Sequence, residues 1–375
     1  MLSSSIDTAA VEAPTPAGRN RFYSLKVASV QPETRDAFTI IFLVPEELRE
    51  TFRFIQGQYV TLRARIGGEE VQRSYSICSG VQDGRLRVGI KRTPTGIFSN
   101  WAAENLKPGS MLEVMPPEGR FHVNLCPQQV RHYVAFAVGS GITPVLSLIT
   151  TTLLTEPNST FTLFYGNRTS STIMFREELA ELKDVHLDRF SLIHIMTREH
   201  QDIDLLNGRM TGDRAARLLQ QFCRPGRVDY VFLCGPRPMV DDMIPSLKQL
   251  GIPEAHIKVE LFTPSTLDRE AAGPLTASPA EECRVTLLAD AREHSFSMEK
   301  DSETILDAGL NRGIDLPHSC KSGVCATCRA KLIEGQVKMD ANYALEEDEV
   351  ARGFILTCQS YPLTPEVKVD FDQDS

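Results

Sequence analysis

Four cysteines near the C-terminus constrain this chain more than any other feature. Cys320, Cys325 and Cys328 follow the spacing C-x4-C-x2-C, and Cys358 comes after a further 29 residues. This is the plant-type ligand pattern for a 2Fe-2S cluster. A structural zinc site is the alternative for four thiolates, but zinc sites usually use two close pairs. Such a cluster exchanges one electron at a potential of about −400 mV, so the rest of the chain is expected to be redox machinery.

Length and composition allow two or three globular domains. The 375 residues are 42% hydrophobic and 24% charged, which is ordinary for a globular protein. No stretch approaches the roughly 18 apolar residues that a membrane span needs. Residues 1–19 are expected to be a disordered segment, neither a signal nor an anchor. The remaining cysteines are scattered without a disulfide framework, which favours a reducing cytoplasm; they are Cys78, Cys126, Cys223, Cys234 and Cys283.

The formal charge of −9 is concentrated at the C-terminal end. Residues 282–375 hold 10 Lys and Arg against 18 Asp and Glu, a net charge of −8. This distribution argues against nucleic acid as a partner. The acidic region is either an ordinary solvated surface or a docking face for a basic partner protein, and the sequence leaves both readings open.

Residues 20–126 have the pattern of a small antiparallel β-barrel. Short stretches rich in β-branched and aromatic residues predict strands. Turn sequences such as Gly67-Gly68 and Asp83-Gly84 lie between them and favour hairpins. The strands predicted most clearly are 38–44, 58–62 and 85–90.

Residues 127–262 change to the alternating pattern of a doubly wound α/β domain. The apolar run 132–138 predicts a buried parallel strand. A glycine turn, 139–144, and a helix from Val145 to about Thr155 follow, with Pro144 as the first helical residue. This order is a dinucleotide-binding unit, in which the helix N-terminus faces a pyrophosphate. The elements expected next are strand 161–166, helix 174–183, strand 190–197, helix 211–221, strand 229–234 and helix 236–250.

These two regions resemble the ferredoxin-NADP-reductase superfamily. Residues 73–76, Arg-Ser-Tyr-Ser, match its R-x-Y-[ST] flavin strand, and residues 96–99 match its G-x-x-S loop. The resemblance implies bound FAD: an arginine suits the pyrophosphate, an aromatic ring covers the flavin, and a hydroxyl reaches it. Taken alone, Arg73 could be a surface residue and Tyr75 a half-buried strand residue. The flavin-binding residues implied are Arg73, Tyr75, Ser76, Gly96 and Ser99.

The resemblance extends to the nicotinamide side. Residues 139–144 match the nicotinamide-side loop, residues 234–236 match a C-G-x motif, and residues 260–262 match a terminal E-x-aromatic motif. It implies that Ser76, Cys234 and Glu260 act at the hydride-transfer site. A buried, inert Cys234 and a Phe262 that simply ends the core of an edge strand are the alternatives. The further cofactor-binding residues implied are Gly139, Gly141, Thr143, Gly235 and Phe262.

The choice of coenzyme is predicted from the end of the second strand of the α/β domain. Residues 161–165 are followed by Gly-Asn-Arg-Thr-Ser, which includes an arginine and no carboxylate. A carboxylate there usually binds the ribose of NAD, whereas an arginine accommodates the phosphate of NADP. The sequence therefore predicts NADPH, with Arg168 as 2′-phosphate ligand helped by Ser170 or Ser171. A solvent-facing Arg168 is the alternative.

Residues 263–281 predict a flexible linker with a span of about 25 Å, followed by a 2Fe-2S domain at 282–375. Strands at 283–289 and 294–299, a helix near 303–311 and the ligand loop resemble the α+β, β-grasp fold of plant-type ferredoxins. The three-domain order implies an NAD(P)H-dependent oxidoreductase. FAD accepts two electrons from NADPH or NADH and releases them singly to the cluster.

Three short segments narrow the resemblance to reductase components of multicomponent oxygenases. The resemblance implies that the electron acceptor is an oxygenase, which we expect to be a di-iron protein. A reductase for a Rieske-type or steroid hydroxylase remains an alternative, as does a redox sensor whose cluster is the signal. The three segments are residues 165–170, 316–320 and 368–372.

Overall fold

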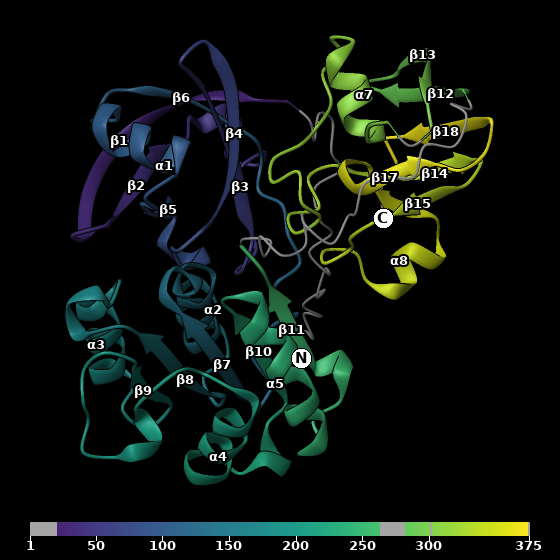
Figure 1. The fold of residues 1–375 in the computed structure, drawn as a ribbon. Coiled ribbons are helices and arrows are strands. Elements are labelled where there is room, and N and C mark those ends of the chain that lie inside the picture. The colour runs from purple at the N-terminus through teal and green to yellow at the C-terminus, as the bar shows by residue number, and fades with distance from the viewer. Residues whose placement is uncertain (1–20, 263–281, 301, 374–375) are drawn as a thin grey trace, which may run out of the picture.

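A computed structural model describes residues 21–262, 282–300 and 302–373, which form three domains (Figure 1). Each domain is built around its own main sheet. The predicted N-terminal segment 1–19 and linker 263–281 lie outside the described residues. Within the described residues, no helix is long and apolar enough to cross a membrane.

The first domain is a six-stranded antiparallel sheet in the order β4-β3-β6-β1-β2-β5. Ile77, directly after β4, bridges Val88 of the opposite edge strand β5, so the sheet closes on itself. Alternate residues such as Val60 and Leu62 point into its apolar core. The predicted β-barrel is therefore confirmed. Its elements are β1 (Tyr23–Thr34), β2 (Ala37–Leu43), β3 (Tyr59–Ile66), β4 (Glu69–Ser76), β5 (Leu86–Lys91), α1 (Ile97–Asn105) and β6 (Met111–Val114).

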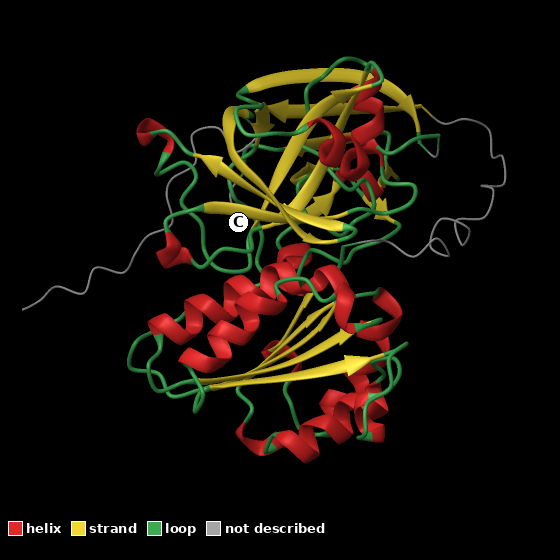
Figure 2. Ribbon diagram, turned by 90° about the vertical axis from the view of Figure 1, so that its left-hand side faces the viewer, coloured by secondary structure: helices red, strands yellow, loops and turns green. Residues whose placement is uncertain are grey.

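The second domain is a five-stranded parallel sheet in the order β11-β10-β7-β8-β9, with helices on both faces (Figure 2). Residues of β7 alternate between two apolar cores: Ala135 packs in one, and Val134 and Phe136 pack in the other. The predicted doubly wound α/β fold is confirmed. Its strands are β7 (His132–Val138), β8 (Thr160–Asn167), β9 (Phe190–Met196), β10 (Tyr230–Cys234) and β11 (Ile257–Glu260), and its helices are α2 (Ile142–Thr155), α3 (Arg176–Val185), α4 (Gly212–Phe222) and α5 (Arg237–Gln249).

Helix α2 begins earlier than the sequence predicts. Gly139–Gly141 form a 3-10 turn that leads directly into the helix at Ile142, so Pro144 is its third residue rather than its first. A proline still fits there, because the first turn of a helix has no intrahelical acceptor for its N–H groups.

The third domain is a mixed sheet in the order β13-β12-β18-β14-β16. Strands β12 and β18 are parallel, and the other pairs are antiparallel. Helix α7 packs Ile305 and Leu306 into its core, and the predicted α+β fold is confirmed. Its elements are β12 (Glu282–Ala289), β13 (Arg292–Glu299), α7 (Ile305–Asn311), β14 (Arg329–Glu334), β15 (Val337–Met339), α8 (Glu347–Ala351), β16 (Phe354–Leu356), β17 (Ser360–Pro362) and β18 (Glu366–Asp370).

Candidate redox site

The three predicted catalytic residues meet where the barrel contacts the parallel sheet. Ser76 ends β4, and its hydroxyl donates a 3.0 Å hydrogen bond to Oε1 of Glu260, which ends β11. Cys234 ends β10 and is paired in register with Glu260. Residues 76 and 260 are far apart in sequence, so closure of the barrel on the α/β domain creates this contact.

The carboxyl group of Glu260 is held in a buried environment. Among the described residues, its Oε2 atom is buried and has no hydrogen-bond partner. Burial raises the pKa of Glu260 from 4.5 to about 8, and the Ser76 hydrogen bond opposes this shift. Glu260 is therefore largely protonated at neutral pH, which lets it donate a hydrogen bond as well as accept one.

Cys234 is a fully buried thiol beside this carboxyl group. Burial, and then the charge of Glu260, raise its pKa well above the ordinary value. The thiol stays protonated and cannot serve as a thiolate nucleophile. It lies beside the nicotinamide-side loop, since a Cβ atom at Gly141 would be 3.2 Å from its Sγ.

Glycines bring the nicotinamide-side loop against β10. Gly139 has φ +57°, which favours glycine. A Cβ atom at Gly141 would lie 2.2 Å from the carbonyl oxygen of Cys234, so a larger residue would push the two strand ends apart. Thr143 is buried and its hydroxyl donates to the carbonyl of Ser140, while Gly235 directly follows β10.

The predicted flavin residues gather around β4 and the start of α1. The Tyr75 ring packs on Phe98 with centroids 5.7 Å apart, and Arg73 is exposed. Gly96 precedes α1, and a Cβ atom there would lie 2.3 Å from Oγ of Ser99. Among the described residues, this buried Oγ has no hydrogen-bond partner. An exposed guanidinium, an aromatic ring and an unpartnered buried hydroxyl fit the donor and stacking needs of a flavin nucleotide.

Glu199 lies at the loop after β8, where the 2′-phosphate of NADPH is predicted to bind, and the sequence alone did not indicate it. Arg168 directly follows β8 and is exposed, and the N–H of Ser170 donates a 2.7 Å hydrogen bond to Oε2 of Glu199. Glu199 follows β9, the strand beside β8, so a carboxylate does lie at this loop. The signal that identifies it is sheet geometry, because adjacent parallel strands end at the same edge.

Phe262 is not the last core residue of the edge strand β11. Strand β11 stops at Glu260, and Phe262 exposes 38% of its surface. The alternative of a core residue is therefore wrong, and an exposed ring remains for contact with a ligand.

The four predicted ligand cysteines lie in and beside one loop of the third domain. Cys325, Cys328 and Cys358 are buried and Cys320 is half-buried. The loop has unusual backbone conformations, since Lys321 and Ala326 have φ of 49° and 55° without being glycines. Such strain in non-glycine residues is typical of functional loops.

The sulfur atoms form two pairs. Hydrogen bonding between Cys320 and Cys325 lowers the pKa of Cys320 and raises that of Cys325. Hydrogen bonding between Cys328 and Cys358 lowers the pKa of Cys358 and raises that of Cys328. The N–H of Ser322 also donates to Sγ of Cys320 at 3.4 Å. Two pairs of cysteine sulfur atoms fit a cluster of two irons, each of which takes two protein ligands.

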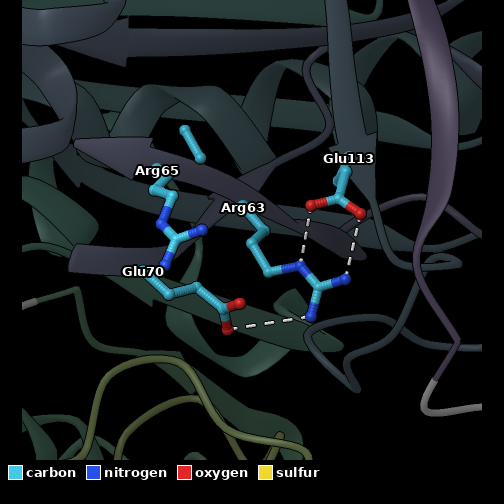
Figure 3. A pocket seen from close by; sticks show the side chains of 5 residues that line it. Arg63, Arg65, Glu70 and Glu113 are labelled. Atoms are coloured by element: carbon cyan, nitrogen blue, oxygen red, sulfur yellow. Dashed lines mark hydrogen bonds and ion pairs between the residues drawn. The ribbon is translucent and has the colours of Figure 1, made fainter. Parts of the chain in front are cut away.

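A separate pocket on the barrel contains none of the predicted site residues (Figure 3). Arg63 donates two 3.0 Å hydrogen bonds to the carboxylate of Glu113 and lies 3.7 Å from Glu70. Arg65 and Ala64 complete its lining. Because its carboxylates neutralise the charge of Arg63, the pocket is an ion-pair network rather than an anion site.

Family models match all three domains. The oxidoreductase FAD-binding domain matches residues 24–123, the oxidoreductase NAD-binding domain matches residues 136–244, and the 2Fe-2S iron-sulfur cluster binding domain matches residues 288–363. These matches support the cofactors predicted from the sequence, FAD, NAD(P)H and a 2Fe-2S cluster, and exclude the zinc alternative.

Relatives match along nearly the whole chain. A subunit of the 1,2-phenylacetyl-CoA epoxidase of Escherichia coli (strain K12) is 46% identical over 94% of this chain and 98% of that protein. The ferredoxin reductase component of 3-ketosteroid-9-alpha-monooxygenase from Rhodococcus rhodochrous is 34% identical over 94% of this chain and 97% of that protein.

Solved structures share the fold. Phthalate dioxygenase reductase superposes with a TM-score of 0.57 at 22% identity, over 93% of this chain and 98% of that one. An intact type IV self-sufficient cytochrome P450 monooxygenase gives a TM-score of 0.68 at 20% identity, over 96% of this chain and 42% of that one. The chain belongs to the family of NAD(P)H-dependent oxygenase reductases with FAD-binding, NAD-binding and 2Fe-2S domains that includes the 1,2-phenylacetyl-CoA epoxidase subunit.

Proposed function

We propose that this chain is the reductase component of a 1,2-phenylacetyl-CoA epoxidase and passes electrons from NADPH to a di-iron oxygenase component in the cytoplasm. The observation that carries the proposal is the 46% identity to the Escherichia coli protein along 98% of its length. The segments that narrowed the resemblance from sequence, residues 165–170, 316–320 and 368–372, point to the same protein. We assign the domain boundaries at 20–126, 127–262 and 282–375.

When bound, FAD would supply the two-electron chemistry that receives hydride from NADPH, and the cluster would supply one-electron transfer. Arg73 would bind the pyrophosphate of FAD, Tyr75 would cover its ring, and the buried hydroxyl of Ser99 would donate to it. Gly96 leaves room for that approach.

At the hydride-transfer site, the chain's own groups hold a proton and keep water out. The Ser76 hydroxyl orients Glu260 through their 3.0 Å hydrogen bond. With its raised pKa, Glu260 keeps a proton in the site at neutral pH. Cys234 and Gly141 fix the distance between the ends of β7 and β10, which sets where the nicotinamide can lie, and the exposed Phe262 would cover the flavin from the same side.

On the cluster side, Cys320, Cys325, Cys328 and Cys358 would supply the thiolates. Backbone N–H groups such as that of Ser322 stabilise the negative charge on the sulfur atoms. Burial of three of the four cysteines limits access of water and oxygen to the site.

The test is single-turnover oxidation of the fully reduced protein by candidate oxygenases. The reductase is mixed with a purified di-iron epoxidase component and phenylacetyl-CoA, and reoxidation is followed with product formation. Fast, substrate-dependent reoxidation supports the proposal. Reoxidation by a Rieske-type oxygenase but not by the epoxidase would contradict it.

A steroid hydroxylase reductase is the second candidate, because the 3-ketosteroid-9-alpha-monooxygenase component is 34% identical over nearly the whole chain. The same experiment with a ketosteroid oxygenase separates the two. A redox sensor is distinguished by turnover: rapid NADPH-dependent reduction of cytochrome c argues for a reductase, since a sensor has no need of catalytic rates.

A further inference from the structure

One face of the barrel hairpin β3–β4 carries hydroxyl groups that reach the cluster domain. Tyr59 is paired with Ser76, and Thr61 with Ser74, across the two antiparallel strands. Residues directly opposite in such a pair point to the same face. Tyr59 is therefore a neighbour of the residue predicted to contact the flavin ring.

From this face, two hydroxyls bind the cluster domain. The Tyr59 hydroxyl donates to the backbone carbonyl of Cys325 and lies 3.3 Å from Oγ of Thr327. The Ser74 hydroxyl donates to Oγ of Ser319 at 2.9 Å. The two contacts flank the first half of the predicted ligand loop, at residues 319 and 325.

Tyr59 is enclosed at this junction. It exposes 7% of its surface, and its backbone N–H donates to the carbonyl of Glu118, which fixes the strand in place. A Cβ atom at Gly119 would come within 3.0 Å of the Tyr59 ring, so the chain leaves just enough space for the ring. A buried tyrosine needs a partner for its hydroxyl, and here that partner is a ligand-bearing residue.

Other contacts hold the cluster domain as a whole. The buried carboxylate of Glu349 binds Arg329 of its own domain at 2.8 Å and Arg120 of the barrel. Arg237 of the α/β domain binds the hydroxyl of Tyr343. None of these side-chain contacts is to a ligand cysteine, although the backbone N–H of Tyr343 donates to the carbonyl of Gly323 in the ligand loop.

We propose that Tyr59 is a positioning residue for electron transfer: its hydroxyl fixes the cluster-ligand loop in register with the strand that ends at Ser76. This inference rests on the proposed function as a flavin-to-cluster reductase. Tyr59 itself exchanges neither an electron nor a proton. Its O–H dipole points at the ligand loop and favours an added electron on the cluster. The same hydrogen bond keeps the distance between the barrel and the cluster domain fixed.

The test compares Tyr59→Phe with Tyr343→Phe in the complete, cofactor-loaded protein. Each variant removes one hydroxyl that joins the cluster domain to another domain, and only the first hydroxyl contacts a residue that carries a predicted ligand. Rates of flavin reduction by NADPH and of cluster reduction by the flavin are measured by stopped-flow absorbance. The midpoint potential and the electron paramagnetic resonance spectrum of the cluster are measured by redox titration.

For Tyr59→Phe we expect cluster reduction to slow on the order of five-fold, as for loss of one neutral hydrogen bond, with flavin reduction close to the wild-type rate. The cluster potential should fall and its spectrum should change. For Tyr343→Phe the potential and spectrum should match wild type even if the rate falls, because weaker docking alone does not alter the ligand loop.

An unshifted potential and spectrum in Tyr59→Phe, or the same shift in Tyr343→Phe, would overturn the inference. If Tyr59→Phe is purified without its cluster, Thr327→Val decides, since it removes the second neighbour of the Tyr59 hydroxyl; a potential equal to wild type then counts against positioning. Failure of the wild-type protein to reduce any epoxidase, with the Tyr59→Phe shift present, would reject the proposed function and leave this inference standing.

Discussion

The two junctions between domains are built differently. Between the barrel and the α/β domain, the apolar core is continuous: Phe121 and Val123 of the barrel region pack in one cluster with Val145 and Leu148 of α2. The cluster domain meets the other two largely through polar contacts, including an ion pair between Lys258 and Glu346, with Val324 and Tyr343 partly buried against the core of the α/β domain.

This difference matches two different mechanical needs. Hydride transfer requires the nicotinamide and the flavin to be held at a fixed geometry, and a shared apolar core provides this because separating it would expose buried surface. Polar interfaces between domains separate more easily. The cluster domain must give its electron to another protein, so a polar junction suits a domain that also has to present its cluster outward.

The largest effect is expected from removing a cluster ligand. Cys328→Ala should abolish the cluster and all NADPH-dependent reduction of cytochrome c, while NADPH still reduces the flavin, because the barrel and α/β domain form their own core. Iron content, the visible spectrum and ferricyanide reduction are the measurements. Loss of FAD together with the cluster would show that the two junctions are not independent.

A large effect on stability is expected at the buried junction. The pKa of Glu260 is raised from 4.5 to about 8 in the folded protein, so the stability that its neutral form contributes is complete below pH 4.5 and is lost as the pH rises through 8. At about 1.4 kcal/mol per pKa unit, the full shift corresponds to roughly 5 kcal/mol.

Glu260→Gln should therefore gain stability relative to wild type as the pH rises from about 5 to 8.5, measured as the difference in melting temperature. Ser76→Ala is the matched control, because it removes the hydrogen bond that lowers the pKa of Glu260. In Ser76→Ala, the loss of stability with rising pH should therefore extend to a higher pH than in wild type. A difference between Glu260→Gln and wild type that does not change with pH would contradict the raised pKa.

A smaller effect is expected at the nucleotide loop, away from both junctions. If Arg168 binds the 2′-phosphate of NADPH, losing that charged hydrogen bond costs about 1.5–3 kcal/mol. Arg168→Ala should then raise KM for NADPH about ten-fold or more and leave KM for NADH nearly unchanged.

Glu199→Gln is the opposite test at the same loop, because it removes a negative charge beside Ser170. We expect it to lower KM for NADPH. Equal effects of Arg168→Ala on both coenzymes, or a wild type that prefers NADH, would reject the assignment.

The sequence predicted those features that local pattern determines. The cysteine spacing predicted a 2Fe-2S domain, which the family match supports, and alternating apolar runs and glycine turns identified the parallel sheet and its helices. It did not predict contacts between segments distant in sequence. The hydrogen bond from Ser170 to Glu199 depends on which strands are neighbours, and that from Tyr59 to Cys325 depends on how two domains dock. Phe262 was ambiguous because its exposure depends on where β11 ends.

The smallest effect is expected at the polar junction between the cluster domain and the α/β domain. The acidic side chains of the cluster domain can contact the α/β domain there or a partner protein. Glu346 lies 3.6 Å from Lys258 of the α/β domain and is itself exposed, whereas Glu347, the next residue, is exposed on α8. Exposed ion pairs contribute about 0–1 kcal/mol, so Glu346→Gln should slow flavin-to-cluster transfer by no more than about five-fold.

Glu347→Gln makes the same change of charge on the neighbouring side chain and serves as its control. If the acidic face also docks on a basic oxygenase, Glu347→Gln should slow delivery to the oxygenase and leave flavin-to-cluster transfer unaffected. Delivery should also slow between low salt and 0.1 M salt, where charges more than about 10 Å apart are screened. A delivery rate that is independent of salt, with both variants equal to wild type, would mean that the excess acidic charge is a solvated surface and that other contacts hold the cluster domain against the barrel and the α/β domain.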